Sequence, residues 1–184
     1  MVRHHIGFRR KRNRVTKKKA STPSRSRTVT WEDPSIGFET IRAMSGLESL
    51  RALKKGEIPP PPFMDLFGIE LVEVEEGRVV FELEPEEYHL NWANNVSGGT
   101  ISTLLDAAMT HAVHSTLAAE SGFTTVELKA NFVRTISAQI DTLRCEGRVI
   151  HTGRRISTAE GRLMDLQGRL YAHGTATCMI FPLV

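Results

Sequence analysis

The sequence predicts an α+β fold in which an antiparallel β-sheet curls around one α-helix. Six segments show the alternation of apolar and polar residues that is typical of strands, and short turns separate most of them. One longer segment, between the second and the third of these strands, carries apolar residues at the spacing of a helix. Because a sheet and a helix must each bury an apolar face, the order ββαββββ indicates a sheet that encloses the helix.

Residues 1–30 form a basic tail. They hold eleven of the 24 Lys and Arg residues and no Asp or Glu, which leaves 13 basic against 21 acidic residues in the rest of the chain. Like charges, Ser and Pro with almost no apolar residues predict that this tail is disordered. It could serve as a transit peptide, as a tether to an anionic surface or nucleic acid, or only as a solvated extension. Nucleic acid is not otherwise an expected partner, because the body of the protein is acidic.

The length and the apolar content predict one domain without a membrane segment. A chain of 184 residues with 40% hydrophobic residues can build one core of ordinary size. The sequence has no run of eighteen apolar residues and no secretory signal, so we expect a soluble, cytoplasmic protein that does not engage membranes. Cys145 and Cys178 each stand alone within an apolar run, which predicts two reduced core residues.

Residues 36–58 are expected to form an amphipathic helix and the start of a Pro-rich spacer. Apolar residues recur every three positions and share one helical face: Ile41, Met44, Leu47, Leu50 and Leu53. The helix should end near Lys54, and the run from Pro59 to Pro62 should act as a stiff connection, because proline cannot continue a helix. We expect this helix to be a lid or an edge helix of the main domain, residues 60–184.

The main domain begins with two strands and continues with the enclosed helix. Residues 66–77 alternate apolar and charged side chains and end at a Gly turn, and residues 78–87 follow as the hairpin partner. Residues 98–117 are predicted to form the helix, with apolar residues at Ile101, Leu104, Leu105, Ala108, Ala112 and Val113. Four more strands are predicted over residues 124–134, 141–153, 154–165 and 168–181.

The start of the enclosed helix carries the residues best suited to chemistry. Gly98 and Gly99 allow a ligand to approach the backbone, and the N–H groups of a first helical turn favour an anion. Asp106 lies two turns further on among apolar residues, where burying a charge is costly. It is either a catalytic base or nucleophile, or an exposed or salt-bridged residue. Asn91, in the preceding loop, could orient a water or a carbonyl group, or could close a turn.

Five motifs, in this order, resemble the PaaI-type acyl-CoA thioesterases of the hotdog superfamily. They are HLN at 89–91, VSGG at 96–99, TLLDAAM at 103–109, TTVELKANFVR at 124–134 and GRLYAHGTATCMIF at 168–181. The resemblance covers about Pro60 to Phe181. It implies a hotdog fold, in which a curled sheet wraps one central helix. It also implies a homodimeric or homotetrameric enzyme that hydrolyses an acyl-CoA, with a small, medium-length or aryl-acetyl acyl group, to free acid and CoA.

The resemblance also implies roles for particular residues. Gly98 resembles the residue whose backbone N–H polarises the thioester carbonyl, and Asp106 resembles the carboxylate that the opposing protomer contributes. Asn91 would hold the carbonyl or a water, and Thr125 would help to position the nucleophilic water. Asp106 is then a general base or a nucleophile, and the presence of Asn91 and Thr125 favours the base. This chemistry requires no metal and no cofactor.

Further residues are candidates for binding the substrate. His89 belongs to the loop motif and could form a wall of the pocket or bond to the loop backbone. Ser97 and Gly99 stand on either side of Gly98. Three arginines could meet the phosphates of CoA, or could simply be solvated at the surface: Arg134, Arg154 and Arg155.

The sequence departs from the family pattern at Ser97, because relatives usually carry His before the two glycines. A Ser hydroxyl could replace this His through a shorter hydrogen bond, and activity would then survive. Otherwise the protein is a hotdog module that binds acyl-CoA without efficient turnover. Retention of Asn91 and Asp106 favours the enzyme.

Three other chemistries have less support. The GxSxG motif is absent, which argues against Ser97 as the nucleophile of a serine hydrolase. His111 and His114 have a spacing compatible with a metal, but no third ligand is evident. A hydratase or dehydratase would pair His111 with Asp106, and residues five apart on a helix point in different directions.

Overall fold

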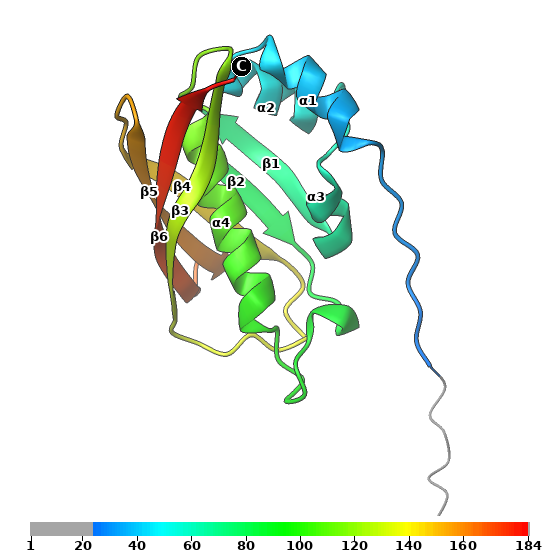
Figure 1. The fold of residues 1–184 in the computed structure, drawn as a ribbon. Coiled ribbons are helices and arrows are strands. Elements are labelled where there is room, and N and C mark those ends of the chain that lie inside the picture. The colour runs from blue at the N-terminus through cyan, green and yellow to red at the C-terminus, as the bar shows by residue number, and fades with distance from the viewer. Residues whose placement is uncertain (1–23, 184) are drawn as a thin grey trace, which may run out of the picture.

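The computed structural model describes residues 24–183, and residues 1–23 of the predicted basic tail lie outside the described part. The elements follow the predicted order ββαββββ after three short helices (Figure 1). The helices are α1 (Pro34–Arg42), α2 (Gly46–Lys54), α3 (Pro62–Phe67) and α4 (Gly98–His114). The strands are β1 (Ile69–Glu75), β2 (Arg78–Leu83), β3 (Ser121–Phe132), β4 (Leu143–His151), β5 (Ile156–Asp165) and β6 (Leu170–Pro182).

The six strands form one antiparallel sheet in the order β1-β2-β4-β5-β6-β3, which curls around α4 (Figure 1). This arrangement confirms the predicted α+β class. β1 and β2 form the predicted hairpin, with Gly77 in its turn at a φ of 75°. β3, by contrast, follows α4 to the far edge of the sheet and pairs with β6, and the chain then returns to pair β4 with β2. The sequence pattern therefore predicted the strands, but not that β3 would be an edge strand.

The central helix packs close to the sheet. Its predicted apolar face is buried: Ile101, Leu104, Leu105, Ala108, Ala112 and Val113. Gly147 of β4 is paired with Gly161 of β5 beneath this face. A Cβ atom added at Gly147 would come within 2.1 Å of the carbonyl oxygen of Ala108, so only glycine permits this approach. The close packing fixes the position of α4, and of the functional residues on it, relative to the sheet.

The prediction of one helix within residues 36–58 is wrong, because the chain forms two helices there, α1 and α2. The Ser45 hydroxyl accepts a hydrogen bond from the N–H of Glu48, and the Glu48 carboxylate accepts one from the N–H of Ser45. This capping box starts α2 as a separate helix. The regularly spaced apolar residues therefore belong to two helices and not to one. The Pro-rich spacer is also shorter than predicted, because Pro62 is the first residue of α3. Proline is tolerated at the first position of a helix.

Residues 24–30 of the predicted tail have no regular secondary structure, but two of their arginines contact the body of the protein. Arg25 pairs with Glu87 at 2.5 Å. The Arg27 guanidinium donates hydrogen bonds to the carbonyl oxygens of Asp65 and Leu66, at 2.9 and 2.8 Å, and lies 3.9 Å from the ring centre of Tyr88. The acidic surface of the domain and the end of α3 thus hold this part of the basic segment.

The two buried cysteines agree with the prediction made from the sequence. Cys145 and Cys178 are buried and form no disulfide bond. Burial raises the pKa of both thiols, that of Cys178 to about 11, so both stay protonated at neutral pH. Between residues 24 and 183, no helix combines the length and the hydropathy needed to cross a bilayer.

Candidate active site

The amino end of α4 presents backbone N–H groups to solvent. Ser97 is the N-cap, and its hydroxyl accepts a hydrogen bond of 3.2 Å from the N–H of Thr100 and lies 3.0 Å from the Thr100 hydroxyl. Gly98 and Gly99 follow in the first turn, and both are exposed. Within residues 24–183 their two N–H groups have no hydrogen-bond acceptor. They can therefore donate to an oxyanion, and the positive end of the helix dipole assists them.

The loop before α4 is closed by the side chain of Asn91. The Asn91 amide oxygen accepts hydrogen bonds from the N–H groups of Ala93 and Asn95, at 2.8 and 3.3 Å. Asn94 adopts a left-handed conformation with a φ of 57°, as the tight loop requires. Asn91 is thus a turn residue, one of the two roles that its sequence left open. Only its amide NH2 group is available to a ligand, because the loop already occupies the oxygen.

The ring of His89 bonds to the backbone and does not form a pocket wall, so the structure selects one of the two roles that the sequence left open. The ring is buried, with 3% of the residue exposed. Nδ1 accepts a hydrogen bond from the N–H of Glu86, and Nε2 therefore carries the proton and donates to the carbonyl oxygen of Phe67. The backbone carbonyl of His89 accepts from the N–H of Ser97. His89 thus anchors the loop that leads into α4.

A groove of about 420 Å³ lies beside the amino end of α4. It brings together residues that are distant in the sequence, namely Asn91, Gly98, Ile101, Phe132, Val133 and Arg134. The aromatic ring of Phe132 would be 3.5 Å from a Cβ atom at Gly98, so the ring lies directly over the start of the helix. The groove therefore combines anion-binding N–H groups, an amide and a guanidinium with apolar walls, which suits an acyl thioester with a phosphorylated carrier.

Asp106 and Thr125 meet near the middle of α4. The Thr125 hydroxyl donates a hydrogen bond of 3.0 Å to Oδ1 of Asp106. Burial raises the pKa of this carboxyl above its usual value, and the hydrogen bond from Thr125 opposes the rise. Asp106 remains half-buried rather than enclosed. A carboxylate held in this way is a stronger base than one in water and stays accessible to a small reactant.

Asp106 and Gly98 are too far apart to act on the same carbonyl group within one protomer. Eight residues separate them along α4, which corresponds to about 12 Å at 1.5 Å per residue. Hydrolysis requires the base and the oxyanion donor within a few ångströms of one carbon atom. Within one chain, Gly98 and Asn91 therefore form one group of candidate residues, and Asp106 and Thr125 form a separate one.

The three candidate arginines do not lie together. Arg134 lines the groove at the amino end of α4. Arg154 and Arg155 are exposed in the turn between β4 and β5. The strand pairs Ile156–Met179 and Met179–Thr124 place this turn near the start of β3. Arg134 follows the opposite end of β3, so one protomer cannot use all three arginines on one CoA.

His111 and His114 lie in a separate pocket near the carboxyl end of α4. The Nδ1–H group of His111 donates to the carbonyl oxygen of Ala107 at 2.8 Å, and Nε2 of His114 lies 2.9 Å from the Ser49 hydroxyl. Aromatic rings surround the pair, and no group of three His, Cys, Asp or Glu side chains suited to a metal occurs among the described residues. Sequence reasoning did not bring Ser49 and His114 together, because they are 65 positions apart and share no motif.

Comparisons with known proteins agree with the fold and with the sequence motifs. The family profile described as Thioesterase superfamily matches residues 93–172, which include α4 and β3 to β5. A search of curated proteins found no match.

Solved structures match the chain over most of their own length. A phenylacetic acid degradation-related protein from Ralstonia eutropha is 28% identical, with a TM-score of 0.65, and the match covers 71% of this chain and 98% of that one. The PaaI protein from the phenylacetic acid degradation operon of E. coli has a TM-score of 0.65 at 20% identity, covering 75% and 96%. A Streptococcus mutans protein bound to acetyl CoA has a TM-score of 0.57 at 24% identity, covering 62% and 89%.

The profile match and the fold indicate the class of the protein: a thioester hydrolase with a hotdog fold, similar to the thioesterase superfamily over residues 93–172. Within this class, the motifs around Asn91, Gly98 and Asp106 and the Ralstonia structure make the chain similar to the PaaI-type proteins.

Proposed function

We propose that the protein hydrolyses acyl-CoA thioesters in a homodimer whose active sites lie between the protomers. One protomer supplies Gly98 and Asn91, and the other supplies Asp106 and Thr125. The observation that carries this proposal is the pairing of exposed first-turn N–H groups with a half-buried carboxylate about 12 Å away on the same helix. A twofold axis beside α4 would place the two halves of different protomers at one carbonyl group.

In the proposed reaction Asp106 acts as a general base. The carboxylate takes a proton from a water molecule held by the Thr125 hydroxyl, and the water oxygen forms a bond to the acyl carbon. The N–H of Gly98 stabilises the negative charge that develops on the carbonyl oxygen. When this intermediate collapses, the C–S bond breaks, CoA leaves as a thiolate, and the Asp106 carboxyl returns the proton to the sulfur. No metal and no cofactor takes part.

The groove beside Gly98 is the proposed CoA end of the site. Arg134 supplies a guanidinium for a phosphate, and the apolar walls suit the pantetheine arm. The Streptococcus mutans protein of the same fold, whose structure contains acetyl CoA, supports CoA as the carrier. Ser97, where relatives carry His, keeps its hydroxyl in the helix cap, so the cap itself preserves the geometry of the Gly98 N–H.

β3 is the proposed dimer interface. It is a twelve-residue edge strand, and Val126 and Leu128 on it are 53% and 36% exposed. A long edge with apolar side chains favours pairing with a second copy. Two β3 strands paired in this way would join the sheets and bring both copies of Thr125 near the axis. The resemblance to PaaI-type thioesterases also supports a homotetramer built from two such dimers.

Release of free CoA thiol from a panel of short, medium and aryl acyl-CoAs tests this function. Asp106→Asn should lower kcat by about 10² to 10⁴, the range for loss of a general base. Gly98→Pro should lower kcat by about 10² to 10³, because proline removes the N–H that we assign to the oxyanion hole. The first helical position accepts proline, and Ser97 already has the extended backbone that must precede it.

Gly98→Ala is the matched control, because it adds a side chain but keeps the N–H. It should retain most of the activity. If the wild type binds acyl-CoA but releases no thiol, and Ser97→His restores turnover, the protein is a binding module and the proposed enzyme function is wrong. If Asp106→Asn keeps full activity, the assignment of the base is wrong.

A further inference from the structure

The carboxyl end of α3 is completed by side chains from two other parts of the chain. The last four carbonyl groups of a helix find no donor within the helix itself. In α3 the first of the four, that of Met64, accepts from the N–H of Gly68. The next two accept from the Arg27 guanidinium at 2.9 and 2.8 Å, and the last accepts from the His89 ring at 2.8 Å. All four carbonyl groups therefore have a donor, and Arg27 serves two of them.

Arg27 also contacts the residue beside His89. Its guanidinium lies 3.9 Å from the ring centre of Tyr88, and the ring centres of Tyr88 and His89 are 4.2 Å apart. The face of an aromatic ring attracts a cation, and the planar guanidinium can lie on the ring while its N–H groups donate elsewhere. Arg27 therefore holds the end of α3 and the Tyr88 ring at the same time.

His89 connects this cluster to the amino end of α4. Its backbone carbonyl accepts a hydrogen bond of 2.9 Å from the N–H of Ser97, which is the N-cap of α4 and the residue before Gly98. A series of direct contacts thus runs from Arg27 through Tyr88 and His89 to Ser97. The next N–H along the chain is the one that we assign to the oxyanion hole.

The neighbouring Arg25 makes a contact of a different kind. It pairs with the Glu87 carboxylate, and the two side chains are 66% and 63% exposed. An ion pair this open to solvent contributes little to the position of either partner. Arg25 therefore carries the same charge on the same segment as Arg27, but without the contacts to a helix end and an aromatic ring.

We propose that Arg27 is a positioning residue for the active site, which it reaches through Tyr88 and His89. By fixing His89, it fixes Ser97 and the direction of the Gly98 N–H group. This inference rests on the proposed function. The resemblance to known thioesterases begins at about Pro60, so a segment outside the catalytic domain completes the support of the catalytic loop.

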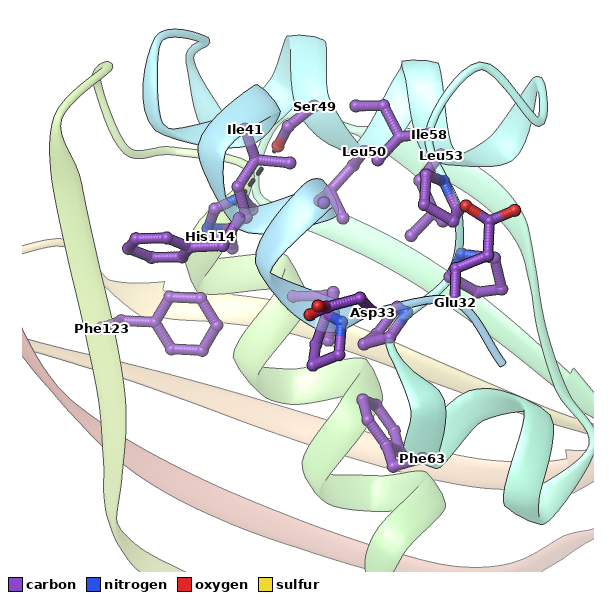
Figure 2. Close-up of a pocket in the computed structure, with 17 residues that line it drawn as sticks. Glu32, Asp33, Ile41, Ser49, Leu50, Leu53, Ile58, Phe63, His114 and Phe123 are labelled. Atoms are coloured by element: carbon purple, nitrogen blue, oxygen red, sulfur yellow. Dashed lines mark hydrogen bonds between the residues drawn. The ribbon is translucent and has the colours of Figure 1, made fainter. Parts of the chain in front are cut away.

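Beyond Arg27 the same segment leads to α1 and to an apolar pocket. Glu32 and Asp33 line this pocket, which has a volume of about 420 Å³ and also has Leu50 and Phe63 in its walls (Figure 2). Loss of the Arg27 contacts through a loosened α1 would change how tightly the substrate binds. A displaced Gly98 N–H would instead slow the chemical step, so kcat and KM separate the two effects.

Arg27→Ala and Arg25→Ala test the proposal with the acyl-CoA that the wild type hydrolyses fastest. Arg27→Ala should lower kcat about tenfold with a change in KM of less than about twofold, because a small displacement of a catalytic group slows the reaction strongly. Arg25→Ala should match the wild type. A kcat of Arg27→Ala within about twofold of the wild type, or an equal fall in Arg25→Ala, would overturn the proposal.

Guanidinium ion provides a rescue experiment, because Arg27→Ala removes a guanidinium from a site shaped for one. Guanidinium chloride, well below denaturing concentrations, should raise the kcat of Arg27→Ala several-fold. Sodium chloride at the same ionic strength should not, since Na⁺ has neither a planar face nor N–H donors. Arg27→Lys keeps the charge without the planar fork, and should be as slow as Arg27→Ala. No gain over sodium chloride, or full activity of Arg27→Lys, would overturn the proposal.

Hydrogen exchange tests the positioning without catalysis and so separates this inference from the proposed function. The Ser97 N–H should exchange about tenfold faster in Arg27→Ala, because its acceptor on His89 is less well held. The N–H of Cys145, which is fully buried in the central strand β4, should keep its rate.

The two results decide the two proposals independently. If no acyl-CoA is hydrolysed, the proposed function fails and hydrogen exchange alone decides the role of Arg27. If the wild type is active but Arg27→Ala keeps its kcat, the proposed function stands and this inference fails. An unchanged Ser97 rate, or an equal acceleration at Ser97 and Cys145 through loss of overall stability, would also overturn it.

Discussion

At the scale of single residues, the chemistry depends on how the fold treats Asp106. The carboxylate is half-buried among apolar neighbours, which raises its pKa, and the Thr125 hydroxyl is the one side chain among the described residues that donates a hydrogen bond to it. Its basicity is therefore set by the balance between desolvation and one hydrogen bond.

Thr125→Val should shift the acidic limb of the kcat/KM profile to higher pH. The hydrogen bond from Thr125 lowers the pKa of Asp106, so its loss lets burial raise that pKa further. A general base must be ionised, and a higher pKa leaves less of it ionised at low pH. Thr125→Ser keeps the hydroxyl and should leave the limb in place. A Thr125→Val profile that only drops in height, without a shift, would show that the hydrogen bond does not control this base.

At the scale of elements, the row of glycines under α4 sets where the helix lies. Gly147, Gly161 and Gly174 are consecutive partners across β4, β5 and β6. A Cβ atom at Gly147 would meet the backbone of Ala108, whereas one at Gly161 would meet the side chain of Met109 at 2.8 Å. A backbone atom within a helix cannot yield without moving the helix, but a methionine side chain can rotate.

Gly147→Ala should therefore destabilise the protein much more than Gly161→Ala. We expect a loss in the free energy of unfolding of about 3 kcal/mol for Gly147→Ala, the upper range for overpacking, and about 1 kcal/mol or less for Gly161→Ala. Denaturant unfolding of the two variants beside the wild type measures both values. Equal losses would mean that α4 is free to move away from the sheet.

At the scale of the whole molecule, the proposed site exists only in an assembly. The two inactive variants Asp106→Asn and Gly98→Pro should complement each other when they are unfolded together and refolded. Random pairing gives about half mixed dimers, and each has one site with an intact Asp106 and an intact Gly98, so about a quarter of the wild-type activity should return. Activity no higher than that of the two parents would place both residues in the site of one protomer.

A charge on the exposed edge of β3 provides the matching test of assembly. Val126→Asp should give a monomer by sedimentation and lose thioesterase activity in the same proportion, because two charged edges repel. An active monomer would refute the shared site.

The sequence by itself determined the α+β class, the six strands and the enclosed helix, because the periods of apolar residues follow directly from which faces are buried. It also singled out Gly98, a glycine at the start of a helix, and Asp106, a charged residue among apolar neighbours where burying the charge is costly. Tertiary structure alone decided that β3 lies at the edge, that His89 and the Asn91 oxygen serve the loop, and that Ser49 meets His114 beneath α1. These features depend on contacts between distant segments, and local patterns carry no information about which distant partner a side chain meets.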